Sequence, residues 1–237
     1  MKNKLKYDKI NILGKCEINQ NYAVDMLYNA TQTDRVINSK MIRFVNFFFN
    51  PKPYGDEERY KDILGRILQK NNYMKDLKIK SIEVNFDYFT DLEFNELEML
   101  GKILTDVLSK KGYKRLNINA DVKEFNYKEN EFQEKFTSYK FFKYKSKNKF
   151  MEVKLYRKFD GVNRFEIIFY NVDNRIFKNF EESLLSGNKI KKVFKDIYDS
   201  IYNVLENDKE LWKDIGIIEF INAFCLALER ENIEDVA

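Results

Sequence analysis

The sequence has no histidine among its 237 residues. Ser-His-Asp and Cys-His catalytic sites, histidine zinc sites and two-histidine metal nucleases all need an imidazole, so these classes of site are excluded. A nuclease built on this chain would have to hold its metal ion with carboxylates, which supply the oxygen ligands that Mg²⁺ prefers.

Glycine, proline and cysteine are scarce as well. With 8 glycines and 2 prolines, the chain is neither collagen-like nor rich in linkers, and it does not have the composition of a many-turned barrel. The two cysteines, Cys16 and Cys225, lie far apart in core-like patterns, so we expect buried thiols. Two such residues provide neither a disulfide framework nor a zinc cluster.

Long apolar runs are also missing. No stretch approaches the roughly 18 uninterrupted apolar residues of a membrane span. The lysine-rich start over residues 1–9 has no apolar segment behind it, which does not fit a secretory signal peptide. We therefore expect a soluble, cytoplasmic protein.

The residues that are abundant indicate a globular chain with a large core. Hydrophobic residues make up 44%, charged residues 34% and aromatic residues 16% of the sequence. A disordered chain would have far fewer apolar residues. The formal net charge of +4 permits a nucleic-acid partner without demanding one.

Segments with strand periodicity and segments with helix periodicity alternate along the chain. We predict strands over 40–50, 79–90, 116–122, 138–144, 151–156 and 164–170, and helices over 56–68, 91–111, 188–207 and 208–230. Asp91 and Asp208 are the expected N-caps of two of these helices, and Gly112 is expected to end the first of them. The pattern predicts an α+β protein with a mainly antiparallel sheet, packed helices and a helical C-terminal unit. The expected domains are 1–186, which would hold the functional sheet, and 187–237.

The hairpin over 151–170 has a register that its own pattern determines. Val153, Leu155, Phe165, Ile167 and Phe169 must share the core face, and directly opposed antiparallel residues lie on one face. Only a loop with an odd number of residues meets this condition, and a three-residue loop over 160–162 does so. This register opposes Tyr156 to Glu166 and Lys158 to Arg164 on the other face. An ordinary solvated sheet face with cross-strand pairs is the alternative interpretation.

The strand over 79–90 adds acidic side chains that point away from its apolar positions. Glu83 and Asp87 are four residues apart, or roughly 13 Å, so they cannot share one metal ion on a straight strand. Asp87 and Glu166, on neighbouring strands, are the better pair. Paired carboxylates are typical ligands of Mg²⁺ or Mn²⁺.

A basic segment precedes and overlaps this hairpin. Residues 140–158 carry seven lysines and one arginine against a single glutamate, a local charge of +7. Aromatic residues are interleaved with the cations, a mixture that favours phosphate contacts combined with base stacking. The candidate contacts are Lys140, Lys143, Lys145, Lys147 and Lys149. A basic surface loop flanked by core aromatics is the alternative.

Two motifs resemble the rolling-circle replication initiators of Gram-positive plasmids and phages. The first is Lys80-Ser-Ile-Glu-Val-Asn-Phe-Asp87, a strand that ends in an acidic residue. The second is Met151-Glu-Val-Lys-Leu-Tyr-Arg-Lys158 followed by Asn163-Arg-Phe-Glu-Ile-Ile-Phe169, which is similar to the family's Tyr-x-Lys and Arg-Phe-Glu strands. The resemblance covers residues 79–170, in a carboxylate-type form without histidine.

The resemblance implies a DNA nickase and strand transferase. Tyr156 would attack a phosphodiester, become joined to the 5′ end and leave a 3′ hydroxyl as primer. Asp87 and Glu166, with Glu83 as a weaker addition, would hold the metal ion. Lys158 and Arg164 would neutralise the charge that builds on the phosphoryl oxygens.

Several alternatives stay open at this point. Tyr88, Tyr144 and Tyr170 are competing nucleophiles. The protein could instead be a non-catalytic phage or plasmid protein that binds nucleic acid, or one that inhibits a host enzyme. The sequence decides neither between a monomer and a homodimer nor whether a host protein is a partner.

Overall fold

The computed structural model describes twelve segments of the chain. These segments are residues 5–18, 29–49, 66–67, 69–71, 74–89, 92–116, 123–126, 131–134, 139–157, 162–170, 187–208 and 214–229.

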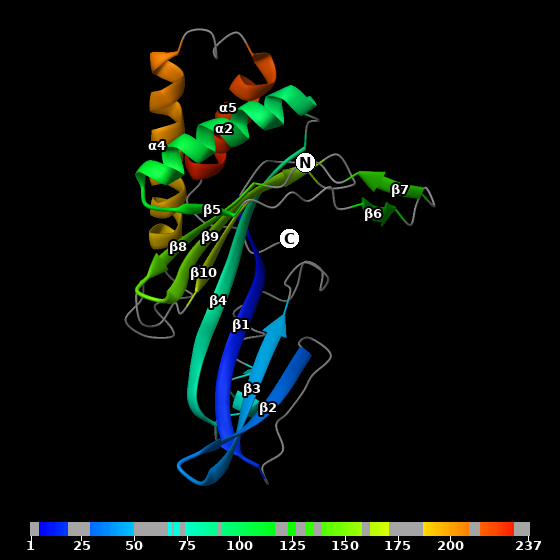
Figure 1. The fold of residues 1–237 in the computed structure, drawn as a ribbon, viewed down its shortest axis with the longest axis vertical. Coiled ribbons are helices and arrows are strands. Elements are labelled where there is room, and N and C mark those ends of the chain that lie inside the picture. The colour runs from blue at the N-terminus through cyan, green and yellow to red at the C-terminus, as the bar shows by residue number, and fades with distance from the viewer. Residues whose placement is uncertain are drawn as a thin grey trace. The chain divides into compact units, whose positions relative to one another are not determined.

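Ten strands and three longer helices lie in these described segments (Figure 1). The strands are β1 (Leu5–Glu17), β2 (Asn29–Ile37), β3 (Lys40–Phe49), β4 (Lys75–Tyr88), β5 (Lys114–Leu116), β6 (Lys123–Asn126), β7 (Glu131–Glu134), β8 (Tyr139–Lys145), β9 (Asn148–Arg157) and β10 (Asn163–Tyr170). The helices are α2 (Phe94–Lys110), α4 (Gly187–Asn207) and α5 (Ile215–Glu229). None of these described helices combines the length and the apolar character that a membrane crossing requires.

The chain divides into two compact units. The helical unit comprises Met1–Leu5, Asn85–Ile168 and Asn188–Ile233, and the ribbon unit comprises Lys6–Val84, Phe169–Gly187 and Glu234–Ala237. The long strand β4 begins in the ribbon unit and ends in the helical unit. The expected domains, 1–186 and 187–237, divide the chain differently and stay a prediction.

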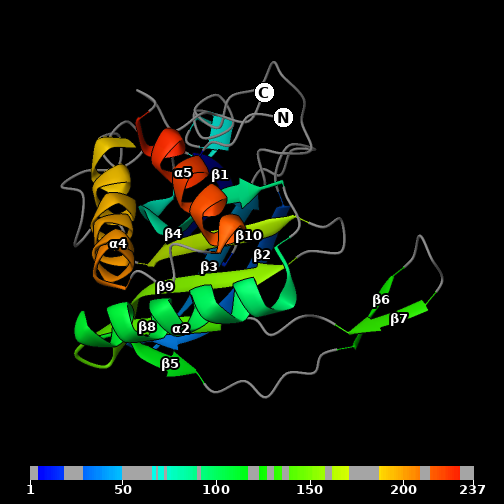
Figure 2. The same cartoon turned by 90° about the horizontal axis from the view of Figure 1, so that it is seen from above.

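In the helical unit, the strands follow the order β4-β10-β9-β8-β5, and the pairs β8–β9 and β5–β8 are antiparallel. α2 runs along β8 (Figure 2). The Tyr139 ring of β8 packs directly on Gly101 of α2, where a Cβ atom would overlap it. Phe165 of β10 contacts Phe194 of α4 and Phe224 of α5 through ring centroids 5.8 and 5.3 Å apart. All three helices therefore cover the same face of this sheet.

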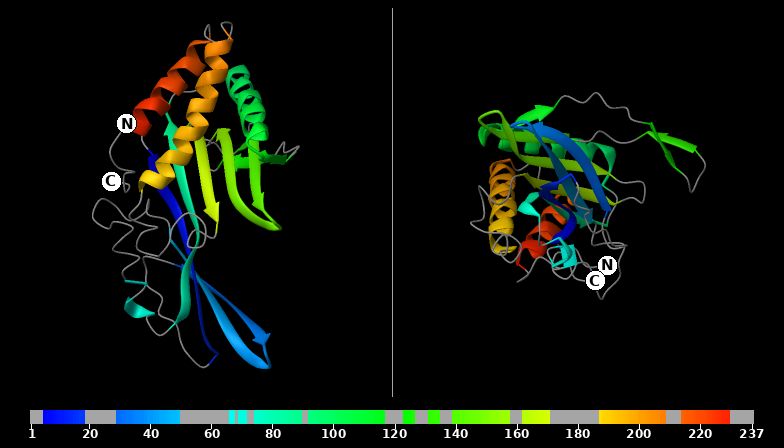
Figure 3. Two further views of the ribbon diagram at one scale, coloured as in Figure 1. Left: turned by 90° about the vertical axis from the view of Figure 1, so that its left-hand side faces the viewer. Right: turned by 90° about the horizontal axis from the view of Figure 1, so that it is seen from below.

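In the ribbon unit, the strands follow the order β2-β3-β1-β4, and β3 pairs antiparallel with both β1 and β2. Asn38 and Ser39 both have positive φ angles, which gives the tight turn between β2 and β3 (Figure 3). Val45 and Phe47 of β3 and Ile10 and Ile12 of β1 are fully buried on one face. The core of this unit lies on that face.

The predicted α+β class with a mainly antiparallel sheet is confirmed, and so are the strands over 40–50, 79–90, 138–144, 151–156 and 164–170. Helices are found within the predicted ranges 91–111 and 188–207 and in the later part of 208–230. Gly112, with a φ angle of 80°, follows the end of α2 as expected. The strands β1, β2, β6 and β7 were not predicted. Most of the predicted helix 56–68 and of the predicted strand 116–122 lies outside the described residues.

Both predicted helix caps were wrong. Glu93 rather than Asp91 is the N-cap of α2, and it forms a capping box with Glu96. α5 begins seven residues after Asp208, where the carboxylate of Asp214 accepts a hydrogen bond from the Ile217 N–H at 3.2 Å. Each helix has a second acidic residue a few residues after the predicted N-cap. The sequence pattern does not decide which of the two residues caps the helix.

Candidate active site

The face of the helical unit's sheet that lies opposite the helices is rich in charged residues. Successive side chains of a strand alternate between its two faces. Because Phe165 packs on α4 and α5, its neighbours Arg164 and Glu166 point to the opposite face. Phe86 also packs on α5, through Phe220 and Phe224, and this places Asp87 on the same face as Arg164 and Glu166.

Strand β9 contributes three more side chains to this face. Tyr139 lies opposite Leu155 in the β8–β9 pair, and the Tyr139 ring packs under α2, so Leu155 is on the helix side. Glu152, Lys154 and Tyr156 alternate with Val153 and Leu155 and point the other way. We call Asp87, Glu152, Lys154, Tyr156, Arg164 and Glu166 the polar face.

Tyr156 and Glu166 meet on this face as the hairpin register predicted. The Tyr156 hydroxyl donates a hydrogen bond to Oε2 of Glu166 over 3.2 Å. Glu166 is only 3% exposed, whereas Tyr156 is half-buried. A phenol that rests on a buried carboxylate has an acceptor for its proton already in place, which is the geometry that general-base catalysis needs.

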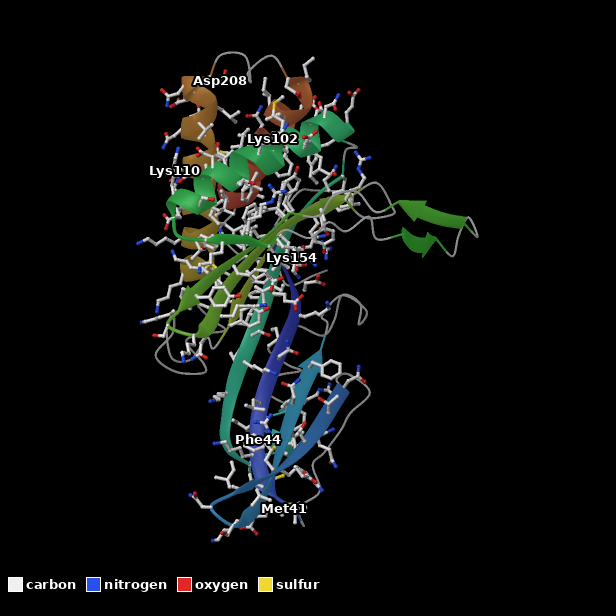
Figure 4. All side chains as sticks on the ribbon, viewed as in Figure 1. Met41, Phe44, Lys102, Lys110, Lys154 and Asp208 are labelled. Atoms are coloured by element: carbon white, nitrogen blue, oxygen red, sulfur yellow. The ribbon has the colours of Figure 1, made fainter. Side chains whose placement is uncertain are left out.

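Lys154 provides the nearest positive charge. Its Nζ lies 2.6 Å from Oε1 of Glu166 and 3.8 Å from Oε1 of Glu152 (Lys154 is labelled in Figure 4). Glu152 also pairs with Lys149, whose Nζ is 3.2 Å away. The two oxygens of Glu166 thus face different partners, with the lysine on one and the phenol on the other.

Asp87 and Arg164 form a buried ion pair at the other side of Glu166. The guanidinium of Arg164 donates two hydrogen bonds to the Asp87 carboxylate, one through Nε and one through Nη2 at 2.7 Å. Nη1 of Arg164 lies 3.9 Å from Oε2 of Glu166. Asp87 is 5% exposed and Arg164 is 3% exposed, so each charge needs its partner.

Positive and negative charges balance within this group. Lys149, Lys154 and Arg164 face Asp87, Glu152 and Glu166, three cations to three carboxylates. Buried charges are tolerated when they are paired and hydrogen-bonded in this way. A cation that already touches the acceptor of the tyrosine proton also lies where a bound phosphate would need positive charge.

Glu83 and Lys158, two of the predicted site residues, are not among the described residues of the helical unit. Glu83 belongs to the ribbon unit, where its carboxylate lies 3.5 Å from Nζ of Lys9. Lys158 lies outside the described residues. The metal-binding role predicted for Asp87, Glu166 and Glu83 stays a prediction, as do the catalytic roles of Tyr156, Lys158 and Arg164.

The lysines of the predicted nucleic-acid strip are distributed over both faces of the sheet. Lys140 lies opposite Lys154, on the polar face. Lys143 lies opposite Met151, on the helix side, with its Nζ 5.0 Å from the centre of the Tyr113 ring. Nζ of Lys149 sits 4.1 Å from the centre of the Phe142 ring. Lys145 and Lys147 are exposed, on either side of the turn residue Ser146. Their binding of nucleic acid stays a prediction.

The competing tyrosines have different environments. Tyr88 is 3% exposed and points to the helix side, where its ring packs on Phe220 and its hydroxyl lies 3.4 Å from Oε2 of Glu219. Tyr144 near the end of β8 is 47% exposed. Tyr170, at the end of β10, is half-buried and belongs to the ribbon unit. The hydroxyl of Tyr156 meets a carboxylate of the polar face.

Lys154 and Glu152 were missed as site residues. The signal was available, because they lie two and four residues before Tyr156 and a strand places such positions on one face. Their importance arises from the ion pairs with Glu166 and Lys149, and a one-dimensional pattern does not show which neighbouring charges will be buried together.

Comparisons with known proteins give a distant likeness among solved structures. No protein-family model matches the chain, and no curated protein matches it. Among solved structures, a rolling-circle replication initiator protein from Geobacillus stearothermophilus is similar, with a TM-score of 0.40 and 9% sequence identity, over 99% of this chain and 100% of that one. A likeness of this size is distant, and no activity of this chain follows from it.

Proposed function

We propose that the polar face catalyses phosphodiester transfer on DNA, with Tyr156 as the nucleophile. The protein would then be a DNA nickase and strand transferase that starts rolling-circle replication of a plasmid or phage. The observation that carries the proposal is the hydrogen bond from the Tyr156 hydroxyl to the buried Glu166 carboxylate, with Lys154 and Arg164 beside it.

The chemical step follows from this geometry. A tyrosine hydroxyl, with an ordinary pKa of about 10, is a poor nucleophile until it loses its proton. Oη of Tyr156 attacks the phosphorus atom while its proton passes to Oε2 of Glu166. The bond from phosphorus to the 3′ oxygen breaks, and that oxygen takes a proton from water. The products are a 5′ phosphotyrosine and a free 3′ hydroxyl.

The two cations are suited to stabilising the transition state. Negative charge builds on the non-bridging phosphoryl oxygens during the attack, and fixed positive groups act most strongly there. Lys154 is held by Glu166, and Arg164 is held by Asp87. Both cations are therefore positioned before DNA arrives, so they need little reorganisation during the reaction.

A divalent metal ion, Mg²⁺ or Mn²⁺, remains part of the proposal. Carboxylate oxygens are the donors that such ions prefer, and they would polarise the phosphate. Asp87 and Glu166 supply these donors, but Arg164 holds Asp87 and Lys154 holds Glu166. A bound ion would have to replace these partners, so the attack described above uses no metal chemistry.

A nicking assay with matched tyrosine variants tests the proposal. A supercoiled plasmid that carries the replicon's own origin is incubated with the protein, with Mn²⁺ or with a chelator. Relaxed plasmid and a covalent protein–DNA adduct are expected with the unchanged protein. Tyr156→Phe should give neither product, and Glu166→Gln should slow the reaction by about 10²- to 10⁴-fold.

Tyr144→Phe is the matched control, because this tyrosine lies on the neighbouring strand and is exposed. It should nick like the unchanged protein. An adduct that persists in Tyr156→Phe would assign the chemistry to another residue. Absence of any relaxed plasmid or adduct with the unchanged protein, in either metal condition, would contradict the nickase proposal.

A non-catalytic nucleic-acid-binding protein is the second candidate. The exposed side chains of Tyr144, Lys145 and Lys147 at the β8–β9 turn favour it, because they combine an aromatic ring with cations. Binding of DNA that depends steeply on salt, without nicking under any metal condition, would support this function instead.

A further inference from the structure

The ribbon unit has a second face that combines aromatic rings with cations. In the two antiparallel pairs of β3, Phe44 lies opposite Lys15 of β1 and Thr33 of β2. Directly opposed residues share a face, and so do residues two apart on one strand. Lys15, Thr33, Arg35, Phe44 and Phe48 therefore lie on one face, which we call the Phe44 face.

The Phe44 face is the accessible side of this sheet. Val45 and Phe47, which alternate with Phe44 and Phe48, are fully buried on the opposite side. Phe44 and Phe48 are only half-buried, and β2 is exposed from Thr31 to its end. Two rings four residues apart on one strand lie about 13 Å from each other. Two partly exposed rings on an inner strand of a sheet are of the kind on which bases can stack.

Cations lie against the first of these rings from both neighbouring strands. Nζ of Lys15 is 5.8 Å from the centre of the Phe44 ring, and Cζ of Arg35 is 5.5 Å from it (Phe44 is labelled in Figure 4). Each distance is within the range of a cation–π contact, so both charges are positioned at the ring. A base that stacked on Phe44 would lie next to these two cations.

The rest of the Phe44 face also carries cations and hydrogen-bonding groups. Lys40 lies four residues before Phe44 on β3, and Glu17 lies opposite Ile42, so both share the face. Among these residues, the three cations Lys15, Arg35 and Lys40 outnumber the one carboxylate, Glu17, by two. The exposed hydroxyls of Thr31 and Thr33 add groups of the kind that donate to phosphate oxygens.

We propose that the Phe44 face binds single-stranded DNA. Bases stack on Phe44 and Phe48, while Lys15 and Arg35 contact the phosphates between them. The strand must be single because bases within a duplex are already stacked on each other and do not offer their faces. The choice of DNA over RNA rests on the proposed function. The face itself lies in a different unit from Tyr156.

Fluorescence anisotropy of a labelled, mixed-sequence 20-nucleotide DNA tests this inference. The protein is the full chain with Tyr156→Phe, in buffer without divalent metal, so that binding is measured apart from nicking. Phe44→Leu keeps an apolar side chain and removes the aromatic face, and it should weaken binding by about 5- to 100-fold. Lys15→Gln and Arg35→Gln should each weaken binding and reduce its salt dependence.

Met41→Leu is the matched control, because Met41 is 48% exposed on the same strand but lies on the opposite face. It should bind like the parent, and the thermal unfolding of each variant shows whether it is folded. Binding by Phe44→Leu within twofold of the parent would overturn the inference. Equal affinity for the matching duplex would overturn base stacking, and tighter binding of the matching RNA would overturn the choice of DNA.

The outcomes also separate this inference from the proposed function. If the protein nicks through Tyr156 while Phe44→Leu binds normally, the Phe44 face is not a DNA site and the nickase proposal stands. If no nicking occurs while Phe44→Leu loses binding, the nickase proposal fails and the Phe44 face still binds single strands.

Discussion

Asp87 and Arg164 show how much a single pair of side chains determines on the polar face. Both are buried, and the two hydrogen bonds between them leave each charge compensated by the other. Arg164 also approaches Glu166, so the same guanidinium orders the acceptor of the Tyr156 hydrogen bond. Stability and chemistry therefore depend on the same residues here.

Asp87→Ala should destabilise the protein strongly. It leaves the buried guanidinium of Arg164 without its carboxylate, and the loss of one partner of a buried pair costs about 3–5 kcal/mol. The free energy of unfolding, measured in urea at neutral pH, reports the loss. The double variant Asp87→Ala with Arg164→Met removes both charges and should recover part of that stability. A loss below about 1 kcal/mol in the single variant would mean that the pair is not buried.

At this scale the sequence predicted which residues meet but not how they are paired. The odd number of residues in the hairpin loop predicted that Tyr156 lies next to Glu166, and the structure has the hydrogen bond between them. Asp87 was expected beside Glu166 as a metal ligand, yet its carboxylate is held by Arg164. Alternation along a strand assigns a face, whereas partner choice depends on the distances between strands.

At the scale of elements, the starts of α2 and α5 are linked through Glu96. Its Oε2 accepts a hydrogen bond from the Glu93 N–H at 2.6 Å, and its Oε1 accepts one from the Gly216 N–H at 3.1 Å. A Cβ atom at position 216 would overlap this carboxylate, so only glycine allows the approach. One side chain thus fixes the first turns of two helices.

Glu96 should make stability depend on pH. Burial, and then the neighbouring Asp214 carboxylate, raise the pKa of Glu96 above its usual value of 4.5. The folded state therefore binds this proton more tightly than the unfolded chain does. The contribution to stability is complete below the ordinary pKa and is lost as the pH rises through the folded pKa. Glu96→Gln keeps an acceptor and lacks the proton equilibrium, so it should gain stability relative to the unchanged protein as the pH rises.

Urea unfolding of both proteins between about pH 4 and pH 7 measures this change. Asp214→Asn retains a capping oxygen for α5 and removes the nearby negative charge, so it should reduce the pH dependence without abolishing it. A difference between the unchanged protein and Glu96→Gln that stays constant across this range would contradict the prediction.

On the scale of the whole molecule, the charge is unevenly distributed along the chain. Residues 140–158 carry a net charge of +7. The whole chain carries +4, so the net charge of the remaining residues is −3. The structure leaves Lys145 and Lys147 exposed at the β8–β9 turn and engages Lys149 and Lys154 in ion pairs. The exposed lysines are the ones that can contribute most directly to long-range attraction of DNA.

Replacing Lys145 and Lys147 by glutamine should therefore weaken DNA binding at low salt. Each phosphate contact contributes about 0.7–0.9 to the slope of log K against log salt, so the double variant should reduce the slope by up to about 2. Affinity measured between 50 and 200 mM salt, roughly the range over which such contacts matter, gives the slope.

Lys102 and Lys110 on α2 provide the matched control for this measurement (both are labelled in Figure 4). They are exposed and pair with Glu98 and Asp106 one turn before them. Their double replacement by glutamine should leave the slope unchanged. An equal reduction in both double variants would mean that DNA responds to net charge and not to the β8–β9 turn.

The sequence alone was enough to predict the class of the fold and the face on which each hairpin residue lies. It did so because the period of two along a strand and the 3.6-residue period of a helix are local properties of the chain. The absence of histidine likewise excluded imidazole chemistry without reference to any coordinates. Tertiary structure decided the rest. It chose Glu93 and Asp214 as caps, grouped α4 and α5 with residues 85–168, held Lys154 against Glu166 and brought Lys15 and Arg35 to the two sides of Phe44. These choices depend on which segments distant along the chain become neighbours, because burial and charge pairing act through space and not along the sequence.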